Sequence, residues 1–242
     1  MSSITAAHAK PTRHRISVPQ WLAASLVQAH QSGARDAMNP VVRVLARSQS
    51  FADWAVGNFP KRPAASVLST AAELRIMHRI AAARTAEQTR TARWFAHDGD
   101  KGVWERELAA WQATVTPAQA AWGAALLAEA RTLNAAINQR AKQRFGRTRP
   151  YAEDRSLTTA VPRSNATSPS YPSGHSARAF LEATIMSALN PARRGAYMAI
   201  AQQMAMSRVY GGVHYPTDVV AGAWEGGAVA TWLLDHRPMP VE

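Results

Sequence analysis

A histidine and a carboxylate lie close together near the C-terminal end of the sequence. His214 stands between Gly211-Gly212, which are expected to end one helix, and Pro216, which is expected to start the next. Asp218 follows His214 by about one helical turn. At this spacing the carboxylate can accept a hydrogen bond from one imidazole nitrogen and leave the other as a nucleophile. A structural histidine beside a helix-capping aspartate is the other interpretation of this pair.

A second group of residues, Pro172-Ser173-Gly174-His175, has the composition of a helix start. The free N–H groups at a helix N-terminus favour an anion, and Gly174 lets the backbone approach that anion closely. His175 would lie in the first turn, where it can donate a proton to a leaving group. An ordinary turn followed by a surface histidine also explains these residues when they are considered alone.

Basic residues are concentrated between Lys142 and Arg149. If one helix continues as far as Pro150, these two side chains lie about 20° apart around its axis and present their charges along one face. A solvated basic face is the simpler interpretation of this segment in isolation.

Together the three groups supply the parts that phosphoryl transfer requires. Lys142, Arg149 and Arg208 would meet the negative charge on the phosphate oxygens. His214 would attack the phosphorus, and His175 would protonate the departing alkoxide and then activate water. The sequence has no cysteine, no His-Glu-x-x-His pattern, no Asp cluster and no Gly-rich loop followed by Lys-Ser/Thr. We therefore expect no metal site and no cofactor.

These residues resemble the three-part signature of the type-2 phosphatidic-acid-phosphatase and vanadium-haloperoxidase superfamily. The signature reads Lys-x6-Arg-Pro, then Pro-Ser-Gly-His, then Ser-Arg-x5-His-x3-Asp. Its fixed positions are filled in order by Lys142, Arg149, Pro150, Pro172, Ser173, Gly174, His175, Ser207, Arg208, His214 and Asp218. Ala141, Ser170-Tyr171 and Asn190-Pro191 make the sequence most similar to the bacterial class A acid phosphatases within this superfamily.

The resemblance implies a role for each matching residue. The phosphate would be held by Lys142, Arg149, Ser173, Gly174 and Arg208. His214 would be the nucleophile, Asp218 its orienting partner, and His175 the general acid and base. The implied protein is a metal-independent acid phosphatase that acts on a small-molecule phosphate monoester. The implied fold is all-α, a compact helical bundle with its active site at converging helix ends.

Two other functions within the superfamily stay open. A vanadate-dependent haloperoxidase would hold vanadate on His214, although such enzymes are usually much longer chains. A lipid phosphatase is the second alternative. Membrane members of the superfamily need several spans, and no stretch here approaches the roughly 20 apolar residues of one span. We therefore expect no integral membrane segment.

The chain carries a formal net charge of +12, which attracts nucleic acid, anionic membranes or anionic small molecules. No zinc finger, basic heptad helix or aromatic-rich RNA-binding motif is present in the sequence, so nucleic acid is not expected as the main ligand. The oligomeric state stays open, a homo-oligomer included. The resemblance favours the periplasm, but the export signal is weak and a cytoplasmic location stays open.

Abundant alanine and the lack of alternating apolar and polar residues favour helices throughout. Residues 1–35 are expected to form a leader or irregular basic tail, and residues 36–242 one acid-phosphatase-like helical domain. Helices are expected over residues 64–83, 85–95, 117–149, 173–189, 192–208 and 216–235. A turn is expected over residues 97–102 and a long loop over residues 151–171.

Overall fold

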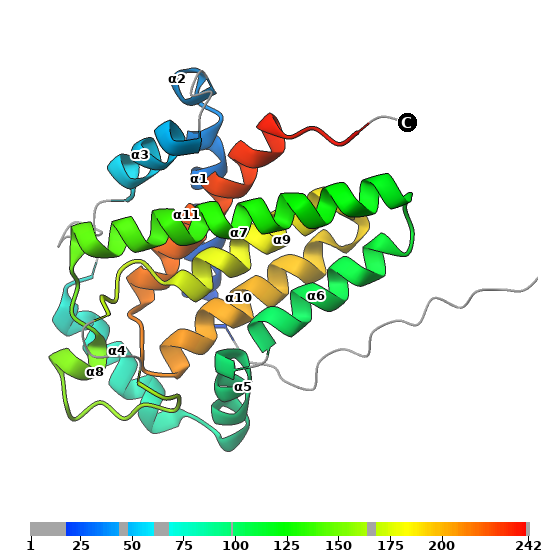
Figure 1. The fold of residues 1–242 in the computed structure, drawn as a ribbon. Helices are drawn as coiled ribbons and strands as arrows, with labels where there is room; N and C mark the ends of the chain where they lie inside the picture. The colour runs from blue at the N-terminus through cyan, green and yellow to red at the C-terminus, as the bar shows by residue number, and fades with distance from the viewer. Residues whose placement is uncertain (1–17, 44–47, 61–67, 98, 164–167, 241–242) are drawn as a thin grey trace, which may run out of the picture.

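The computed structural model describes residues 18–43, 48–60, 68–97, 99–163 and 168–240, and within these residues it contains helices and no strand (Figure 1). The helices are α1 (Gln20–Ala37), α2 (Pro40–Arg43), α3 (Ser48–Asn58), α4 (Thr70–Ala83), α5 (Ala86–His97), α6 (Gly99–Gln112), α7 (Pro117–Phe145), α8 (Pro150–Glu153), α9 (Gly174–Leu189), the short 3-10 helix η1 (Pro191–Arg193), α10 (Arg194–Tyr210) and α11 (Pro216–His236). The predicted all-α fold, a compact helical bundle, is confirmed.

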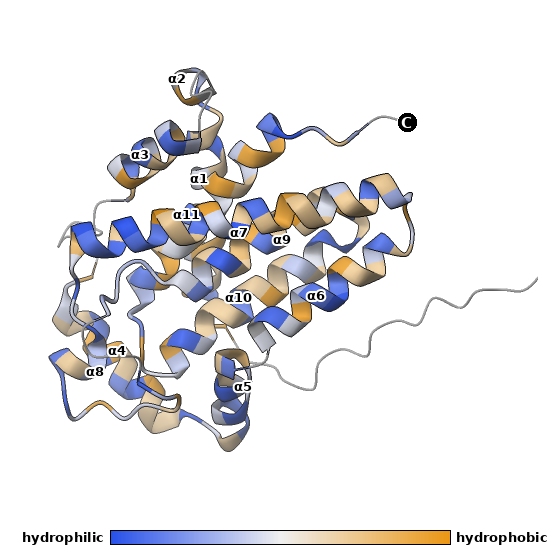
Figure 2. Ribbon diagram, viewed as in Figure 1, coloured by the Kyte–Doolittle hydropathy of each residue, from blue (hydrophilic) through white to orange (hydrophobic). Residues whose placement is uncertain are grey.

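The centre of the bundle is formed by α9 and α11, which pack extensively on each other. Most residues of α11 are buried, and α1 and α10 cover α11 and α9 from further sides. A Cβ atom at Gly226 would lie 2.3 Å from the carbonyl oxygen of Ala177, so only glycine permits this close approach of α11 to α9. Hydrophobic residues accordingly dominate α11, whereas the peripheral helix α5 is largely hydrophilic (Figure 2).

The long helix α7 ends earlier than its sequence predicts. Thr116 caps its N-terminus in a capping box with Gln119, as the Thr-Pro start indicates. At the other end Gly146 adopts the left-handed conformation, with φ of 55°, and stops the helix. Arg149 therefore lies beyond α7 and precedes α8. The prediction that Lys142 and Arg149 share one helical face is wrong.

The N-terminal part of the described chain also differs from the expectation of an irregular tail. Residues 20–35 belong to α1, and Leu22 and Leu26 on this helix are fully buried in the core. Residues 1–17 lie outside the described residues. The turn expected over residues 97–102 is largely helical, because α6 already begins at Gly99. None of the described helices is both long and apolar enough to cross a membrane.

Candidate active site

Three segments that are distant in the sequence meet at one end of the bundle: the chain after α7, the start of α9, and the connection between α10 and α11. They surround a cavity of about 220 Å³. The residues that line it are Ala96, His97, Arg149, Pro162, Arg163, His175, Arg208, Val213 and His214. The structure thus brings four of the predicted site residues to one cavity, two histidines and two arginines.

His214 is held by hydrogen bonds on both ring nitrogens. Its Nδ1 lies 3.4 Å from Asp218 Oδ2, and its Nε2 lies 3.0 Å from Arg149 Nη1. Arg149 can only donate, so Nε2 must be the acceptor and Nδ1 carries the proton toward Asp218. The lone pair of Nε2 therefore lies on the side of Arg149, and His214 lines the cavity.

The backbone of the α10–α11 connection places His214 at this position. Gly212 has φ of 75°, a conformation that side-chain-bearing residues rarely adopt. A Cβ atom there would also lie 3.0 Å from the carbonyl oxygen of Thr158. The connection ends where Pro216 starts α11, so Asp218 in the first turn lies under His214.

Asp218 is fully buried and accepts hydrogen bonds from several directions. The Tyr215 backbone N–H donates to its Oδ2 at 2.9 Å, and the Ser170 hydroxyl donates to the same oxygen. Arg147 Nη1 donates to Oδ1 at 2.6 Å. Burial alone would raise the pKa of Asp218, but the His214 hydrogen bond and the Arg147 charge hold it at about 2. Asp218 is thus a carboxylate with fixed geometry beneath the histidine.

Sequence reasoning missed Arg147 and its partner Glu73. Arg147 is 4% exposed and joins two buried carboxylates, Asp218 and Glu73. Its Nη2 donates to Glu73 Oε2 at 2.5 Å. Glu73 Oε1 in turn accepts from the backbone N–H of Thr217 at 2.9 Å and from its hydroxyl at 2.8 Å. The guanidinium also stacks over the Tyr215 ring, 3.7 Å from its centroid. In the sequence Arg147 is one basic residue in a run, and nothing distinguishes it from Arg144.

The predicted phosphate-binding residues occupy different positions. Arg149 and Arg208 line the cavity and are nearly fully buried. Lys142 lies behind it and donates from Nζ to the carbonyl oxygens of Pro169 at 2.7 Å and Pro172 at 2.8 Å. Ser173 caps α9, since its hydroxyl accepts from the Ser176 N–H. Lys142 therefore fixes the segment that leads into the N-terminus of α9.

His175, in the first turn of α9, lines the cavity together with His214, whereas the preceding Gly174 lines a separate cavity described below. Two further residues of the active-site cavity, His97 and Arg163, were not predicted. His97 ends α5, and Arg163 lies in the long segment after α8. Their types suit an anion site, but only the folded chain brings them to it.

The charges around the cavity shift the titration of its histidines. Burial, followed by the Arg149 and Lys142 charges, lowers the pKa of His214 to about 3 although Asp218 opposes this shift. Burial and the Arg208 charge hold the pKa of His175 well below its usual range. Burial and Arg149 lower the pKa of Lys142 to about 8. Both histidines are therefore neutral in the ligand-free protein at neutral pH.

The arrangement matches a known family. The profile of the PAP2 superfamily matches residues 123–239, which include all three groups of site residues. Residues 123–239 of the chain are therefore a PAP2 superfamily domain. A segment of 88 residues is 39% identical to a lipid A 1-phosphatase of Rhizobium etli, and it covers 36% of this chain and 38% of that protein. The chain thus matches well under half of the length of this curated relative.

A solved structure has a similar fold to this PAP2 chain. It is described as the first transmembrane PAP2-type phosphatidylglycerolphosphate phosphatase, from Bacillus subtilis. The likeness has a TM-score of 0.55 at 21% identity, and it covers 78% of this chain and 92% of that one. At this identity the likeness supports the fold alone.

These relatives correct one expectation about partners. The sequence predicts a small-molecule phosphate monoester as the partner and no integral membrane segment. The named relatives are phosphatases of lipids, and the similar structure is described as transmembrane. The prediction is therefore wrong as it stands. It relied on the similarity to class A acid phosphatases, whose motif residues are shared across the whole PAP2 superfamily. A motif that recognises only the phosphate carries no information about the group attached to it.

Proposed function

We propose that this PAP2 protein is a lipid phosphatase, which hydrolyses a phosphate monoester of a lipid through a phosphohistidine on His214. The observation that supports the chemistry is the geometry of His214, with Nδ1 directed to Asp218 and the Nε2 lone pair beside Arg149 at the cavity. The names of the relatives support a lipid as the carrier of the phosphate.

The first step would use the cations and both histidines of the cavity. Arg149 and Arg208 bind the equatorial phosphate oxygens, where charge develops in the transition state. The Nε2 lone pair of His214 attacks the phosphorus as the phosphorus–alkoxide bond breaks. His175 transfers its proton to the departing oxygen, and the lipid alcohol leaves. Asp218 stabilises the imidazolium of the phosphohistidine through the retained Nδ1–H.

The second step returns the site to its starting state. A water molecule attacks the phosphorus and gives its proton to His175, which is neutral after the first step. The phosphorus–nitrogen bond breaks, inorganic phosphate forms, and His214 is again a neutral imidazole. His175 is thereby protonated while the inorganic phosphate is still bound.

This mechanism needs a protonated His175, whereas burial and the surrounding cations lower the pKa of this residue in the ligand-free protein. A phosphate bound between Arg149, Arg208 and His214 would bring two negative charges next to the imidazole. Opposite charge at this distance favours the charged form and raises the pKa. We therefore expect His175 to gain its proton together with the substrate. The periplasmic location that the class A resemblance favours stays a prediction.

Phosphate release from purified protein tests the proposal. The substrates are phosphatidic acid and phosphatidylglycerolphosphate in detergent micelles, and p-nitrophenyl phosphate and glucose 6-phosphate in water, each over a range of pH. We expect turnover of the lipid phosphates and its loss in His214→Ala. Turnover of the soluble esters alone would contradict the lipid proposal, and wild-type turnover by His214→Ala would contradict the phosphohistidine.

Vanadate separates the proposal from the haloperoxidase alternative. Vanadate mimics the trigonal-bipyramidal phosphorus, so we expect it to inhibit phosphate release, and EDTA to leave the rate unchanged. The vanadate-loaded protein should not oxidise bromide with hydrogen peroxide. A clear bromide-oxidation signal would instead favour the haloperoxidase.

A further inference from the structure

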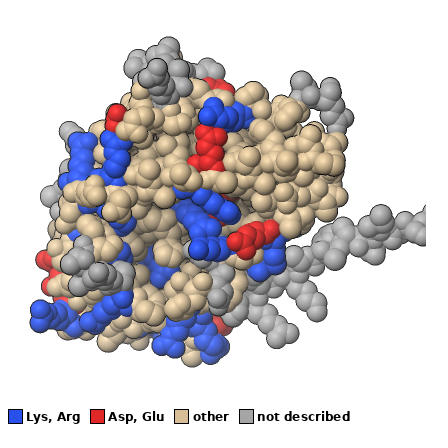
Figure 3. All heavy atoms as spheres, in the orientation of Figure 1, with Lys and Arg blue, Asp and Glu red and all other residues tan. Residues whose placement is uncertain are grey.

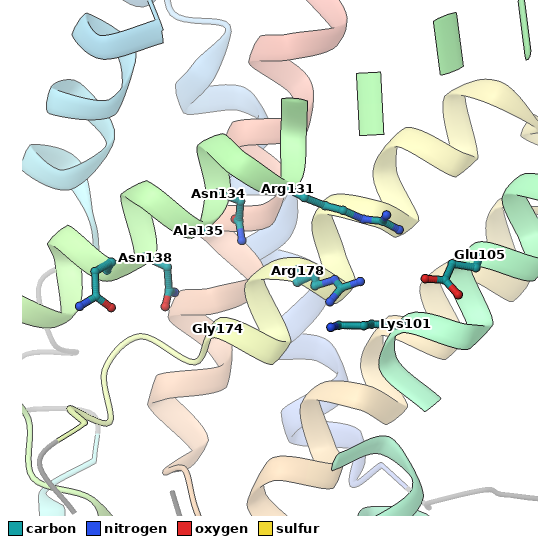
Figure 4. Close-up of a pocket in the computed structure, with 9 residues that line it drawn as sticks. Lys101, Glu105, Arg131, Asn134, Ala135, Asn138, Gly174 and Arg178 are labelled. Atoms are coloured by element: carbon teal, nitrogen blue, oxygen red, sulfur yellow. The ribbon is translucent and has the colours of Figure 1, made fainter. Parts of the chain in front are cut away.

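A second cavity, of about 550 Å³, lies beside the candidate active site and has no role in the proposed mechanism. Among the described residues it is lined by Lys101, Glu105, Arg131, Asn134, Ala135, Asn138, Gln139, Gly174 and Arg178. Three of these are cations, and they come from three helices: Lys101 from α6, Arg131 from α7 and Arg178 from α9. Figure 4 shows the three side chains pointing into the same space. We refer to it as the basic cavity.

A buried carboxylate fixes two of these cations in place. Glu182 is fully buried, and its Oε1 accepts from Arg131 Nε at 2.5 Å and from Arg178 Nε at 3.0 Å. With Glu105 on the opposite wall, two carboxylates face three cations. Figure 3 shows Lys and Arg side chains gathered near the middle of this face, where the surface is hollowed, with acidic side chains beside them. The cavity therefore keeps a positive charge that its own residues do not neutralise.

Two polar atoms at this cavity have no hydrogen-bond partner among the described residues. One is Arg131 Nη2, a buried donor. The other is the amide oxygen of Asn134, whose residue is 4% exposed. A buried donor or acceptor without a partner is costly, because its hydrogen bond to water is lost and not replaced. An occupant with anionic oxygens and a hydroxyl or amide donor would satisfy both atoms.

The basic cavity and the active site are connected through the start of α9. Gly174 lines the basic cavity, and the next residue, His175, lines the active-site cavity. The charge of Arg178 also contributes to lowering the pKa of His175, which shows that the two regions interact electrostatically. The two cavities are therefore adjacent at the start of α9.

We propose that the basic cavity binds a second anionic group, a phosphate or phosphodiester, of the same substrate whose phosphate monoester enters the active site. This inference rests on the proposed function for the identity of the reacting group. It adds that the substrate carries two phosphate groups, and that Arg131 and Lys101 are specificity residues with no part in the chemistry.

A binding experiment tests the second site independently of turnover. Calorimetry would compare alkyl phosphonates with alkane bisphosphonates of increasing linker length, none of which can be hydrolysed. We expect the best bisphosphonate to bind the wild type at least about tenfold more tightly than the phosphonate, with one equivalent per chain, since a charge-assisted hydrogen bond is worth about this factor. Arg131→Gln and Lys101→Gln should each remove most of this preference.

The matched control is Arg140→Gln. Arg140 lies on the same helix α7 but forms an exposed ion pair with Asp53, away from the cavity. This variant should keep the wild-type preference for the bisphosphonate. Equal affinity of the wild type for both ligands, or an unchanged preference in Arg131→Gln, would overturn the inference. Two equivalents of free phosphonate bound without any bisphosphonate advantage would also overturn it, because the cavity would then be an independent anion site.

Turnover distinguishes this inference from the proposed function. Phosphatidylglycerolphosphate carries a phosphodiester besides its monoester, whereas phosphatidic acid carries the monoester alone. Arg131→Gln should lower kcat/KM for the first lipid by about tenfold and leave that for the second unchanged. Equal loss on both lipids would contradict a role in specificity. No phosphate release from either lipid, with the bisphosphonate preference intact, would contradict only the proposed function.

Discussion

Arg147 offers the sharpest test of how the site is held together. Its guanidinium donates to Glu73 Oε2 at 2.5 Å and to Asp218 Oδ1 at 2.6 Å, and all three side chains are at most 4% exposed. Arg147→Met keeps an unbranched apolar chain but leaves two buried carboxylates without their cation. Removing one partner from such a buried network costs about 3–5 kcal/mol. For a chain of this length the melting temperature should fall by about 6–20 °C.

The loss should depend on pH in a defined direction. In the wild type the folded-state pKa of Asp218 is lowered to about 2, so its stabilising contribution is present above the unfolded-state value and disappears as the pH falls toward 2. In Arg147→Met the cation is gone, so the pKa of Asp218 rises from this lowered value. The variant then loses less stability than the wild type as the pH falls. The difference from wild type should therefore be largest near pH 7 and shrink toward pH 4.

Urea unfolding followed by circular dichroism at both pH values measures this difference. Glu73→Gln in the Arg147→Met background removes one of the two buried negative charges and should recover part of the loss. Arg140→Met, which breaks an exposed ion pair with Asp53, should cost no more than about 1 kcal/mol. A loss below about 1 kcal/mol for Arg147→Met, or one that is equal at pH 7 and pH 4, would refute the role of Arg147 as the shared counterion.

Three other perturbations test the site and the packing that supports it. His214→Ala should abolish phosphate release. Asp218→Asn should lower kcat by about 10⁴-fold, as expected when the orienting carboxylate is lost, and should leave the circular dichroism spectrum unchanged. Wild-type kinetics in either variant would contradict the assigned roles. Because the pKa of Lys142 is lowered to about 8, kcat/KM should fall as the pH rises through that value. Lys142→Arg should extend activity to higher pH. Identical pH profiles of kcat/KM for the wild type and Lys142→Arg would exclude Lys142 as the titrating group. Gly226→Ala should lower the free energy of unfolding in urea by about 1–3 kcal/mol. At Gly57 an added Cβ meets no atom within 4 Å, so Gly57→Ala should leave this free energy unchanged or raise it. Equal effects of the two substitutions would contradict the close contact between α11 and α9.

The sequence predicts helix starts better than helix ends in this fold. Thr116 and Ser173 cap α7 and α9 through their hydroxyls, and Pro216 opens α11, as their residue types indicate. The sequence places the end of α7 too late, because Pro150 is the stop that its residue types indicate. Gly146 ends the helix first by adopting a positive φ, which glycine permits but does not require.

The first helix shows a different limit of the sequence. Basic residues precede a modest apolar run, Trp21 to Val27, which resembles a weak export signal, and Pro19 and Gln20 keep this apolar run short. In the structure Pro19 precedes α1, and Leu22 and Leu26 pack into the core with α11. The helix that covers the apolar side of α1 is α11, which lies far along the chain. The hydrogen bond from Trp224 Nε1 on α11 to Asp36 Oδ2 on α1, for example, joins residues 188 positions apart. No local pattern reveals such a partner.

The motif residues were the predictable part of the site, and the acids that hold them were not. Three buried glutamates outside the motifs lie beside basic residues of the two cavities or of the segments that support them. Glu73 binds Arg147, Glu182 binds Arg131 and Arg178, and Glu225 interacts with Lys142. Glu225 also accepts from Asn138 Nδ2 at 2.8 Å, and burial raises its pKa to about 8.

This second layer follows from the chemistry of the first. A site for a phosphate dianion concentrates cations in a poorly hydrated space, and unpaired buried cations are unstable while no ligand is present. Carboxylates placed behind the cations offset this cost, yet they leave the donors on the cavity side available for the ligand. A single glutamate on an apolar helix carries no sequence signal for this role. Glu182 takes this place behind Arg131 and Arg178 of the basic cavity, as Glu73 does beside Arg147 beneath the active site.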